Sequence, residues 1–199
     1  RPIPREELLK RIENVEGLLS HGTEQVDEEL MDRAPKLKVV SNYAVGFDNI
    51  DVAAATKRGI MVTNTPGVLT NATADLAFAL LLAAARRIGE GVRFLRNGKW
   101  EMWKPGLLLG QELFGSILGI IGMGRIGQAV AKRATGFEMT ILYYDQVRQG
   151  EAEERFGARF CSLPELLRES DFVSIHVPLN SETRGLIGAR ELDLMKETA

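Results

Sequence analysis

Three glycines, Gly122, Gly124 and Gly127, constrain the fold of this chain more than any other feature of its sequence. An apolar segment, residues 116–121, precedes them, and residues 125–134 after them favour a helix. This order predicts a strand, a tight turn and a helix. Gly122 permits the turn, Gly124 keeps the space before the helix free of a side chain, and Gly127 lets the helix pack closely against the strand.

The helix start in this motif predicts a binding site for a diphosphate. Unpaired N–H groups and the positive end of the helix dipole favour an anion there. In a strand–turn–helix context this glycine spacing is the fingerprint of dinucleotide binding. We therefore predict NAD as the cofactor, with contacts from the whole turn: Gly122, Met123, Gly124, Arg125, Ile126 and Gly127.

Asp145 bears on the choice between NAD and NADP. It lies 18 residues after Gly127, at the end of the next apolar segment. A carboxylate there accepts hydrogen bonds from the adenosine ribose and repels the 2′-phosphate of NADP. Its neighbours Gln146 and Val147 are included in the predicted cofactor site. The alternative is that Asp145 only caps a loop, and the nearby Arg148 keeps NADP open as a cofactor.

Apolar strand-like segments alternate with helical ones along the whole chain, which predicts an α/β fold with largely parallel sheets. One long helix is expected over residues 72–95, and its first part is expected to be buried on most sides because that part is apolar nearly all round. Asp48 or Asn49 is expected to cap a helix that ends at Lys57. With a boundary near Asn71, the predicted domains are residues 1–70 and 71–199. The other expected strands are 16–20, 37–41, 60–63, 139–144 and 172–176.

Composition excludes several classes of protein. The formal net charge is −2 with both signs interspersed, so no basic surface for nucleic acid is expected. The longest apolar run, residues 76–85, is about half of what a membrane span needs. The single cysteine, Cys161, cannot form an internal disulfide, which favours a cytoplasmic setting. Because no second His or Cys lies at ligand spacing, no metal site is predicted.

Four blocks of sequence, together with the glycine motif, give the chain a family resemblance. It resembles the D-isomer-specific 2-hydroxyacid dehydrogenases, particularly the glyoxylate/hydroxypyruvate reductase branch. The resemblance implies two doubly wound parallel-sheet domains, a flavodoxin-like substrate domain and a Rossmann-type NAD domain, both incomplete in this chain. It also implies hydride transfer between NAD(P)H and a small 2-keto or 2-hydroxy acid. The four blocks are residues 42–51, 62–66, 69–77 and 170–179.

The resemblance assigns roles to particular residues. Backbone N–H groups of Ala44, Val45 and Gly46 would bind the substrate carboxylate, although Gly46 also fits a plain turn after a strand. Thr70 would lie near the nicotinamide, serve as a helix cap, or do both. Val177 and Pro178 would line the adenine or ribose pocket, or simply close a strand. The predicted cofactor site is completed by Thr183.

The residues that the family uses for proton transfer and substrate activation are not found in this chain. By resemblance, an arginine, a glutamate and a histidine are expected after the position of Ala199, so the 199 residues alone are expected to be inactive. His176 fits a packed side chain better than a catalytic one. His21 lies after a strand without a recognisable carboxylate partner, and Cys161 is expected to be structural.

The sequence leaves two points undecided: the exact function within this fold and the role of the loop after the long helix. The same fold serves phosphoglycerate-type dehydrogenases and non-catalytic NAD-sensing corepressor modules, which are the alternatives to a small-acid reductase. Trp100, Trp103 and the leucines at 107–109 lie in a long loop-like segment, where they favour a subunit contact over local packing. The resemblance agrees with a homodimer formed through the NAD-binding domain.

Overall fold

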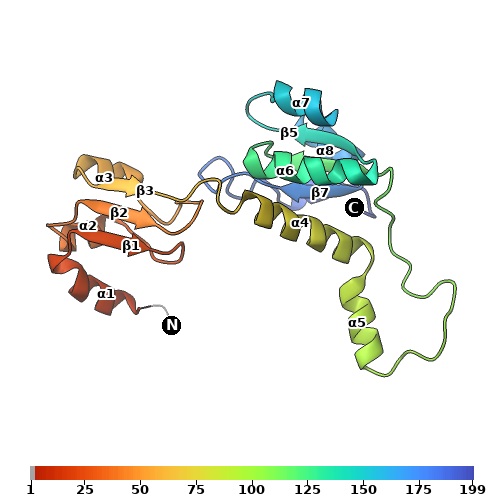
Figure 1. The fold of residues 1–199 in the computed structure, drawn as a ribbon, viewed down its shortest axis with the longest axis horizontal. Helices are drawn as coiled ribbons and strands as arrows, with labels where there is room; N and C mark the ends of the chain where they lie inside the picture. Colours follow the sequence, from red (N-terminus) through yellow and green to blue (C-terminus); the bar gives the residue numbers. More distant parts are fainter. Residues whose placement is uncertain (1–2) are drawn as a thin grey trace. The chain divides into compact units, whose positions relative to one another are not determined.

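The computed structural model describes residues 3–199 and divides into two compact units (Figure 1). The first unit runs to Val68 and also includes Pro178–Arg184. The second comprises Leu69–Val177 and Gly185–Ala199. Both contain a parallel sheet with helices, so the α/β class predicted from the alternating pattern is confirmed.

The first unit is built on a three-stranded sheet in the order β1-β2-β3. Its strands pair in parallel, with Leu18 opposite Val40 and Val40 opposite Val62. Because all strands are parallel, the loops that follow them meet at one edge of the sheet. The elements are α1 (Arg5–Arg11), η1 (Ile12–Asn14), β1 (Gly17–Ser20), α2 (Glu28–Arg33), β2 (Val39–Asn42), α3 (Val52–Lys57) and β3 (Met61–Thr63).

The core of the first unit lies on one face of this sheet. Leu18, Val40 and Val62 pack there with apolar side chains of the three helices, including Leu30 and Ala55. Residues one position along the strands point to the opposite face. Two of them, Leu19 and Met61, are 76% and 64% exposed, so within the described residues only one face of this sheet is covered.

The second unit has a four-stranded parallel sheet in the order β6-β5-β4-β7. From β4 the chain adds β5 and β6 on one side and then returns to place β7 on the other, which creates a switch point at β4 and β7. Its elements are α4 (Thr70–Ala85), α5 (Ile88–Arg96), β4 (Ile117–Ile121), α6 (Arg125–Ala134), η2 (Thr135–Phe137), β5 (Thr140–Tyr144), α7 (Gly150–Phe156), β6 (Arg159–Phe160), α8 (Leu163–Glu169), β7 (Phe172–Ile175) and α9 (Ala189–Leu192).

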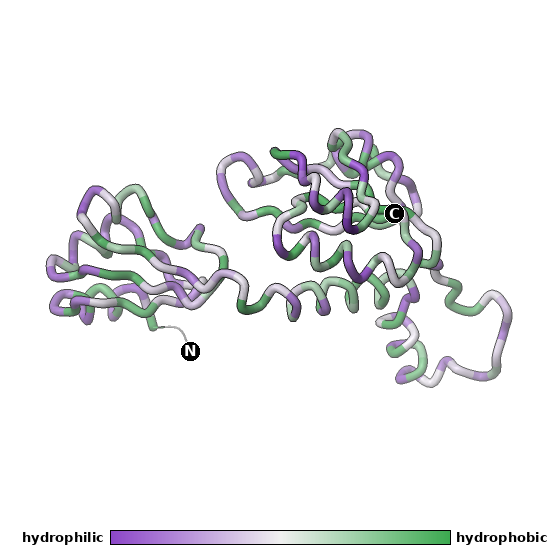
Figure 2. Tube along the Cα trace, turned by 45° about the horizontal axis from the view of Figure 1, so that its top comes forward, coloured by the Kyte–Doolittle hydropathy of each residue, from purple (hydrophilic) through white to green (hydrophobic). Residues whose placement is uncertain are grey.

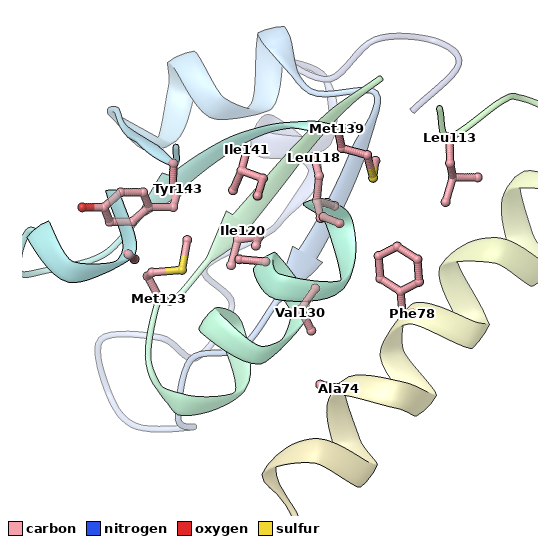
Figure 3. Packing of buried hydrophobic residues seen from close by; sticks show 14 of the residues in the cluster. Ala74, Phe78, Leu113, Leu118, Ile120, Met123, Val130, Met139, Ile141 and Tyr143 are labelled. Atoms are coloured by element: carbon pink, nitrogen blue, oxygen red, sulfur yellow. The ribbon is translucent and has the colours of Figure 1, made fainter. Parts of the chain in front are cut away.

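Helices cover both faces of the second sheet. Figure 3 shows Phe78 of α4 and Val130 of α6 pointing toward Leu118 and Ile120 of β4. On the other face, α8 contributes buried leucines, among them Leu166. The two packed faces make β4 a fully covered central strand, and its carboxyl end is therefore fixed in position.

The long helix predicted over residues 72–95 is wrong in two respects. The chain breaks after Ala85, and Arg87 adopts a left-handed conformation (φ 52°) between α4 and α5. The break is stabilised by a residue far along the chain, because the N–H of Gln111 donates to the carbonyl of Ala85 at 2.8 Å. The helix is also less buried than predicted: α4 is apolar along most of its length (Figure 2), yet Leu76 and Leu80 are each about 60% exposed.

Two smaller predictions also differ from the structure. The cap of α3 is Asp51, whose carboxylate accepts from Ala54 N, and Asn49 is instead buried among tertiary hydrogen bonds. The sequence placed all of 71–199 in one domain, whereas Pro178–Arg184 groups with the first unit. That segment is a loop that follows β7, and its hydrogen bonds include those that join Asn180 to Thr183.

Two features are absent from residues 3–199. No helix in that range has both the length and the apolarity that a membrane crossing requires. No group of three or more His, Cys, Asp and Glu side chains is arranged to hold a metal ion in the same range.

Candidate functional site

The turn after β4 has the conformation that its glycines predict. Gly122 has φ +93°, and a Cβ on it would lie 2.8 Å from the carbonyl carbon and oxygen of His176. Its N–H donates to the carbonyl of Tyr144 at 2.8 Å. The turn is therefore held between the ends of β5 and β7, and only glycine fits at this position.

Gly124 and Gly127 differ sharply in their surroundings. A Cβ on Gly127 would lie 2.1 Å from the carbonyl oxygen of Gly122, so α6 packs directly against the turn. A Cβ on Gly124 would meet nothing within 4 Å. The space in front of α6 is thus open, and no protein atom near Gly124 fills it.

The start of α6 presents free main-chain donors beside this space. The first i to i−4 bond of α6 joins Gln128 N to the carbonyl of Gly124 at 2.9 Å. Across the described chain, the N–H groups of Gly124, Arg125 and Ile126 donate to no protein acceptor. With the positive end of the helix dipole, this arrangement can bind a phosphate group.

Met123 and Ile126 do not face this space with their side chains. Met123 is fully buried and lies beside Ile120 (Figure 3), and Ile126 packs against the same core. The N–H of Met123 is already donated to Asp145 Oδ2 at 2.8 Å. Of the residues predicted in the turn, Gly124 and Arg125 are exposed, and they offer the most direct contact to a ligand.

Asp145 lies at the end of β5, at the rim of the glycine turn. Its Oδ2 accepts from Met123 N, and its Oδ1 accepts from Gln146 N at 2.7 Å. Both bonds fix the carboxylate next to the open space without burying it completely. Gln146 and Val147 follow on the exposed side of this loop. These two bonds also fit the alternative that Asp145 caps the loop, and its contact with the cofactor stays a prediction.

Sequence reasoning missed a clamp that holds the loop after Asp145. Arg148 Nε and Nη2 donate to the two oxygens of Glu153, both at 2.8 Å. Tyr143 Oη donates to Glu153 at 2.7 Å and accepts from Gln149 N at 2.7 Å. The Arg148 guanidinium, helped by the Tyr143 hydroxyl, lowers the pKa of Glu153 to about 2. Arg148, considered above for a 2′-phosphate, is therefore already paired with a carboxylate.

The remaining residues of the predicted cofactor site are distributed over both units. Val177 is adjacent to Gly122 at the switch point. Pro178 is exposed, and the Thr183 hydroxyl donates to its carbonyl within the same loop. Thr70 is the first residue of α4, and because Leu69 occupies the cap position, the alternative of Thr70 as a helix cap is wrong.

The structure gives no catalytic geometry to the two histidines or to Cys161. His176 Nε2 lies 2.8 Å from Ser174 Oγ, and burial lowers the pKa of His176. His21 is exposed, with its ring 6.2 Å from that of Tyr43. Burial raises the pKa of the Cys161 thiol, which disfavours a reactive thiolate.

The first unit carries a second candidate site in the loop after β2, which contains Ala44, Val45 and Gly46. Every one of their carbonyls is occupied by one hydrogen bond. Thr65 N donates to Ala44 O at 3.0 Å, Asn64 Nδ2 to Val45 O at 2.9 Å, and Asn42 Nδ2 to Gly46 O at 2.9 Å. The loop is thus tied to the ends of β2 and β3.

A network of buried polar side chains supports this loop. Asn42 accepts from Ser20 Oγ at 2.9 Å and donates to Asn49 Oδ1 at 3.1 Å. Asn49 donates in turn to the carbonyls of Glu24 and His21 at 2.9 and 3.3 Å. Ser20, Asn42 and Asn49 are all at least 97% buried, so the loops after β1 and β2 form one rigid support.

Comparison with known proteins places these features in a family. The profile described as "D-isomer specific 2-hydroxyacid dehydrogenase, NAD binding domain" matches residues 78–199. A glyoxylate reductase of Thermococcus litoralis is 57% identical over 98% of this chain and 60% of its own length. The chain therefore spans about three fifths of the length of that relative.

Solved structures agree with this similarity. The TT0316 protein from Thermus thermophilus is 50% identical, with a TM-score of 0.90 over 98% of this chain and 61% of that one. A D-lactate dehydrogenase from Aquifex aeolicus, solved in complex with NAD and lactic acid, is 33% identical with a TM-score of 0.88. That match covers 98% of this chain and 56% of the dehydrogenase.

Proposed function

Because the chain belongs to the family of D-isomer specific 2-hydroxyacid dehydrogenases, we propose that its protein reduces small 2-keto acids with a nicotinamide cofactor, and that glyoxylate or hydroxypyruvate is the substrate. The observation that carries this proposal is the open space at Gly124, bordered by the free N–H groups of α6. A diphosphate bridge fits such a donor set. When bound, the cofactor supplies the hydride.

NAD is the proposed cofactor in preference to NADP. Asp145 places a carboxylate at the rim of the turn, where it can accept from ribose hydroxyls and repel a 2′-phosphate. Arg148, the cation that could attract that phosphate, is paired in bidentate fashion with Glu153. Both features favour the cofactor without the extra phosphate.

The loop at 44–46 is the proposed binding site for the substrate carboxylate. Its carbonyls are all occupied, and its N–H groups are left to bind an anion. We place the arginine, the glutamate and the histidine of the reaction in the part of the relatives' length that this chain does not span. Cys161 is a buried free thiol, in keeping with a reducing compartment such as the cytoplasm.

Cofactor binding and turnover test the proposal together. NADH fluorescence should report binding when the full-length protein is titrated, and absorbance should fall when glyoxylate or hydroxypyruvate is added. The 199 residues alone should bind NADH and leave absorbance unchanged. NADH binding without reduction of any 2-keto acid by the full-length protein would favour an NAD-sensing binding module instead.

We also propose a homodimer formed through the second unit. Exposed apolar side chains follow one another along α4, α5 and the loop after them, an arrangement typical of protein interfaces. This loop also borders a hollow of about 450 Å³ lined by Trp100 and Trp103. The exposed side chains are Leu76, Leu80, Ile88, Val92, Leu95, Trp100 and Trp103.

The oligomeric state of one pair of variants tests this interface. Leu80→Asp should shift the full-length protein toward a monomer in sedimentation velocity, because a charge would be buried between subunits. Val52→Asp is the control, since Val52 is 39% exposed on helix α3 of the first unit. A wild-type protein that already sediments as a monomer, or a Leu80→Asp protein that stays dimeric, would rule out the proposed interface.

A further inference from the structure

In the loop after β2, the hydrogen bonds that the carbonyl groups accept also fix the direction of the neighbouring N–H groups. A trans peptide is planar, so its N–H points opposite to its C=O, and no cis peptide occurs among the described residues. Fixing the carbonyl of Val45 therefore fixes the N–H of Gly46. By the same geometry, the carbonyl of Gly46 fixes the N–H of Phe47, and that of Ala44 fixes the N–H of Val45.

Those N–H groups have no competing partner. Among residues 3–199, the N–H groups of Val45, Gly46 and Phe47 donate to no protein acceptor. Each is bonded covalently to a carbonyl that is held from the opposite direction. The loop thus presents successive donors whose orientation is set before any ligand arrives.

Two asparagine side chains set most of this orientation. Asn64 Nδ2 holds the carbonyl of Val45 at 2.9 Å, and Asn42 Nδ2 holds the carbonyl of Gly46 at 2.9 Å. Asn42 cannot rotate its amide freely, because Nδ2 also donates to Asn49 while Oδ1 accepts from Ser20. The buried amide is therefore locked with its donor toward the loop.

We propose that Asn42 and Asn64 are positioning residues for the substrate carboxylate. They touch no substrate; they hold the two peptide planes whose N–H groups, those of Gly46 and Phe47, receive it. This inference rests on the proposed function, because it takes the loop as the carboxylate site. It predicts that a change at either asparagine acts on the affinity for the 2-keto acid and leaves the glycine turn at 122–127, which lies in the second unit, unaffected.

Asn64 offers the cleaner test because it is only half-buried. Asn64→Asp keeps the shape of the side chain and replaces the donor by an acceptor that repels the carbonyl of Val45. In the full-length enzyme, KM for glyoxylate should rise by on the order of tenfold, the value of about one hydrogen bond. The Kd of NADH should stay within about twofold.

A matched substitution controls for the added negative charge on the first unit as a whole. Asn14→Asp makes the same chemical change in the same unit, at an exposed side chain whose oxygen accepts from Lys36. It should leave both KM and Kd at wild-type values. Asn64→Ser, which is smaller and keeps a donor, should give a KM between those of Asn64→Asp and the wild type, and it replaces Asn64→Asp if that protein does not fold.

The outcomes separate this inference from the proposed function. If the wild-type protein reduces no 2-keto acid, the proposed function fails. If it does and folded Asn64→Asp keeps a wild-type KM, the positioning role is wrong while the function stands. A lowered kcat with unchanged KM, or a rise in the Kd of NADH equal to the rise in KM, would also overturn the inference, because both indicate a general structural effect.

Discussion

Replacing Gly124 by alanine should weaken cofactor binding without unfolding the protein. A Cβ at Gly124 meets nothing within 4 Å, and its φ of −74° and ψ of −162° suit an L-residue. Loss of glycine at a helix cap costs roughly 0.5–1 kcal/mol, and the lower entropy of the unfolded chain returns about 0.4–1 kcal/mol. The two effects nearly cancel, so stability should change by less than about 1 kcal/mol.

The same methyl group would stand where the diphosphate has to approach the N–H groups of α6. Losing one or two charge-assisted hydrogen bonds, each worth about 1.5–3 kcal/mol, should weaken binding by about 3 kcal/mol. That loss corresponds to roughly a hundredfold increase in the Kd of NADH. NADH fluorescence titration measures the affinity, and circular dichroism on heating measures the stability.

Gly127→Ala is the matched control within the same motif. Its Cβ would lie 2.1 Å from the carbonyl oxygen of Gly122, so the helix or the turn must move. Overpacking of this kind costs about 3 kcal/mol, which lowers Tm by roughly 6–12 °C in a protein of this size. A Gly124→Ala protein with wild-type affinity for NADH, or with a loss of Tm like that of Gly127→Ala, would refute the argument.

Three further predictions concern the second unit. Glu153 has a pKa lowered to about 2, so it stabilises the folded state above about pH 4.5, and this stabilisation is lost as pH falls toward 2. In Glu153→Gln, the free energy of unfolding should therefore depend less on pH between about 4.5 and 2. The same pH dependence in the variant and the wild type would show that the bonds from Arg148 and Tyr143 to Glu153 do not stabilise the fold. Asp145→Ala should weaken NADH binding by about 1.5–3 kcal/mol and reduce discrimination against NADPH; equal affinities in the variant and the wild type would remove Asp145 from the site. Phe78→Ala should cost about 3–4 kcal/mol in chemical denaturation, whereas Phe114→Ala, at a side chain that is 59% exposed, should cost far less; similar losses would contradict the packing in Figure 3.

Features set by short stretches of sequence were predictable. The turn at 122–127 depends on sterics within six residues, and each glycine has one dominant reason to be glycine. The strands followed from apolar runs bounded by turn residues, and the expected strand 116–121 corresponds to Ile117–Ile121. The carboxylate of Asp145 could be placed because the spacing of a strand–turn–helix–strand unit varies little.

Features set by contacts between distant residues were not predictable. The end of α4 at Ala85 depends on Gln111, 26 residues further along the chain. Local sequence gives little sign of it, since Arg86 and Arg87 are good helix formers. The same holds for Glu153, whose partners Tyr143 and Arg148 meet it only after β5 and α7 have packed together.

The glycine turn can be recognised from sequence, whereas the loop after β2 cannot, and the reason is physical. At the glycine turn the function requires the absence of a side chain, and a glycine in the sequence records that requirement directly. In the loop after β2 the proposed donors are N–H groups, which nearly every residue has, so the binding residues carry no chemical signature. The signature lies in the donors that hold the carbonyls, such as Asn42 and Asn64. An asparagine suits a turn, a helix cap or a buried bond equally well, and only the closure of three loops over one sheet edge decides between them.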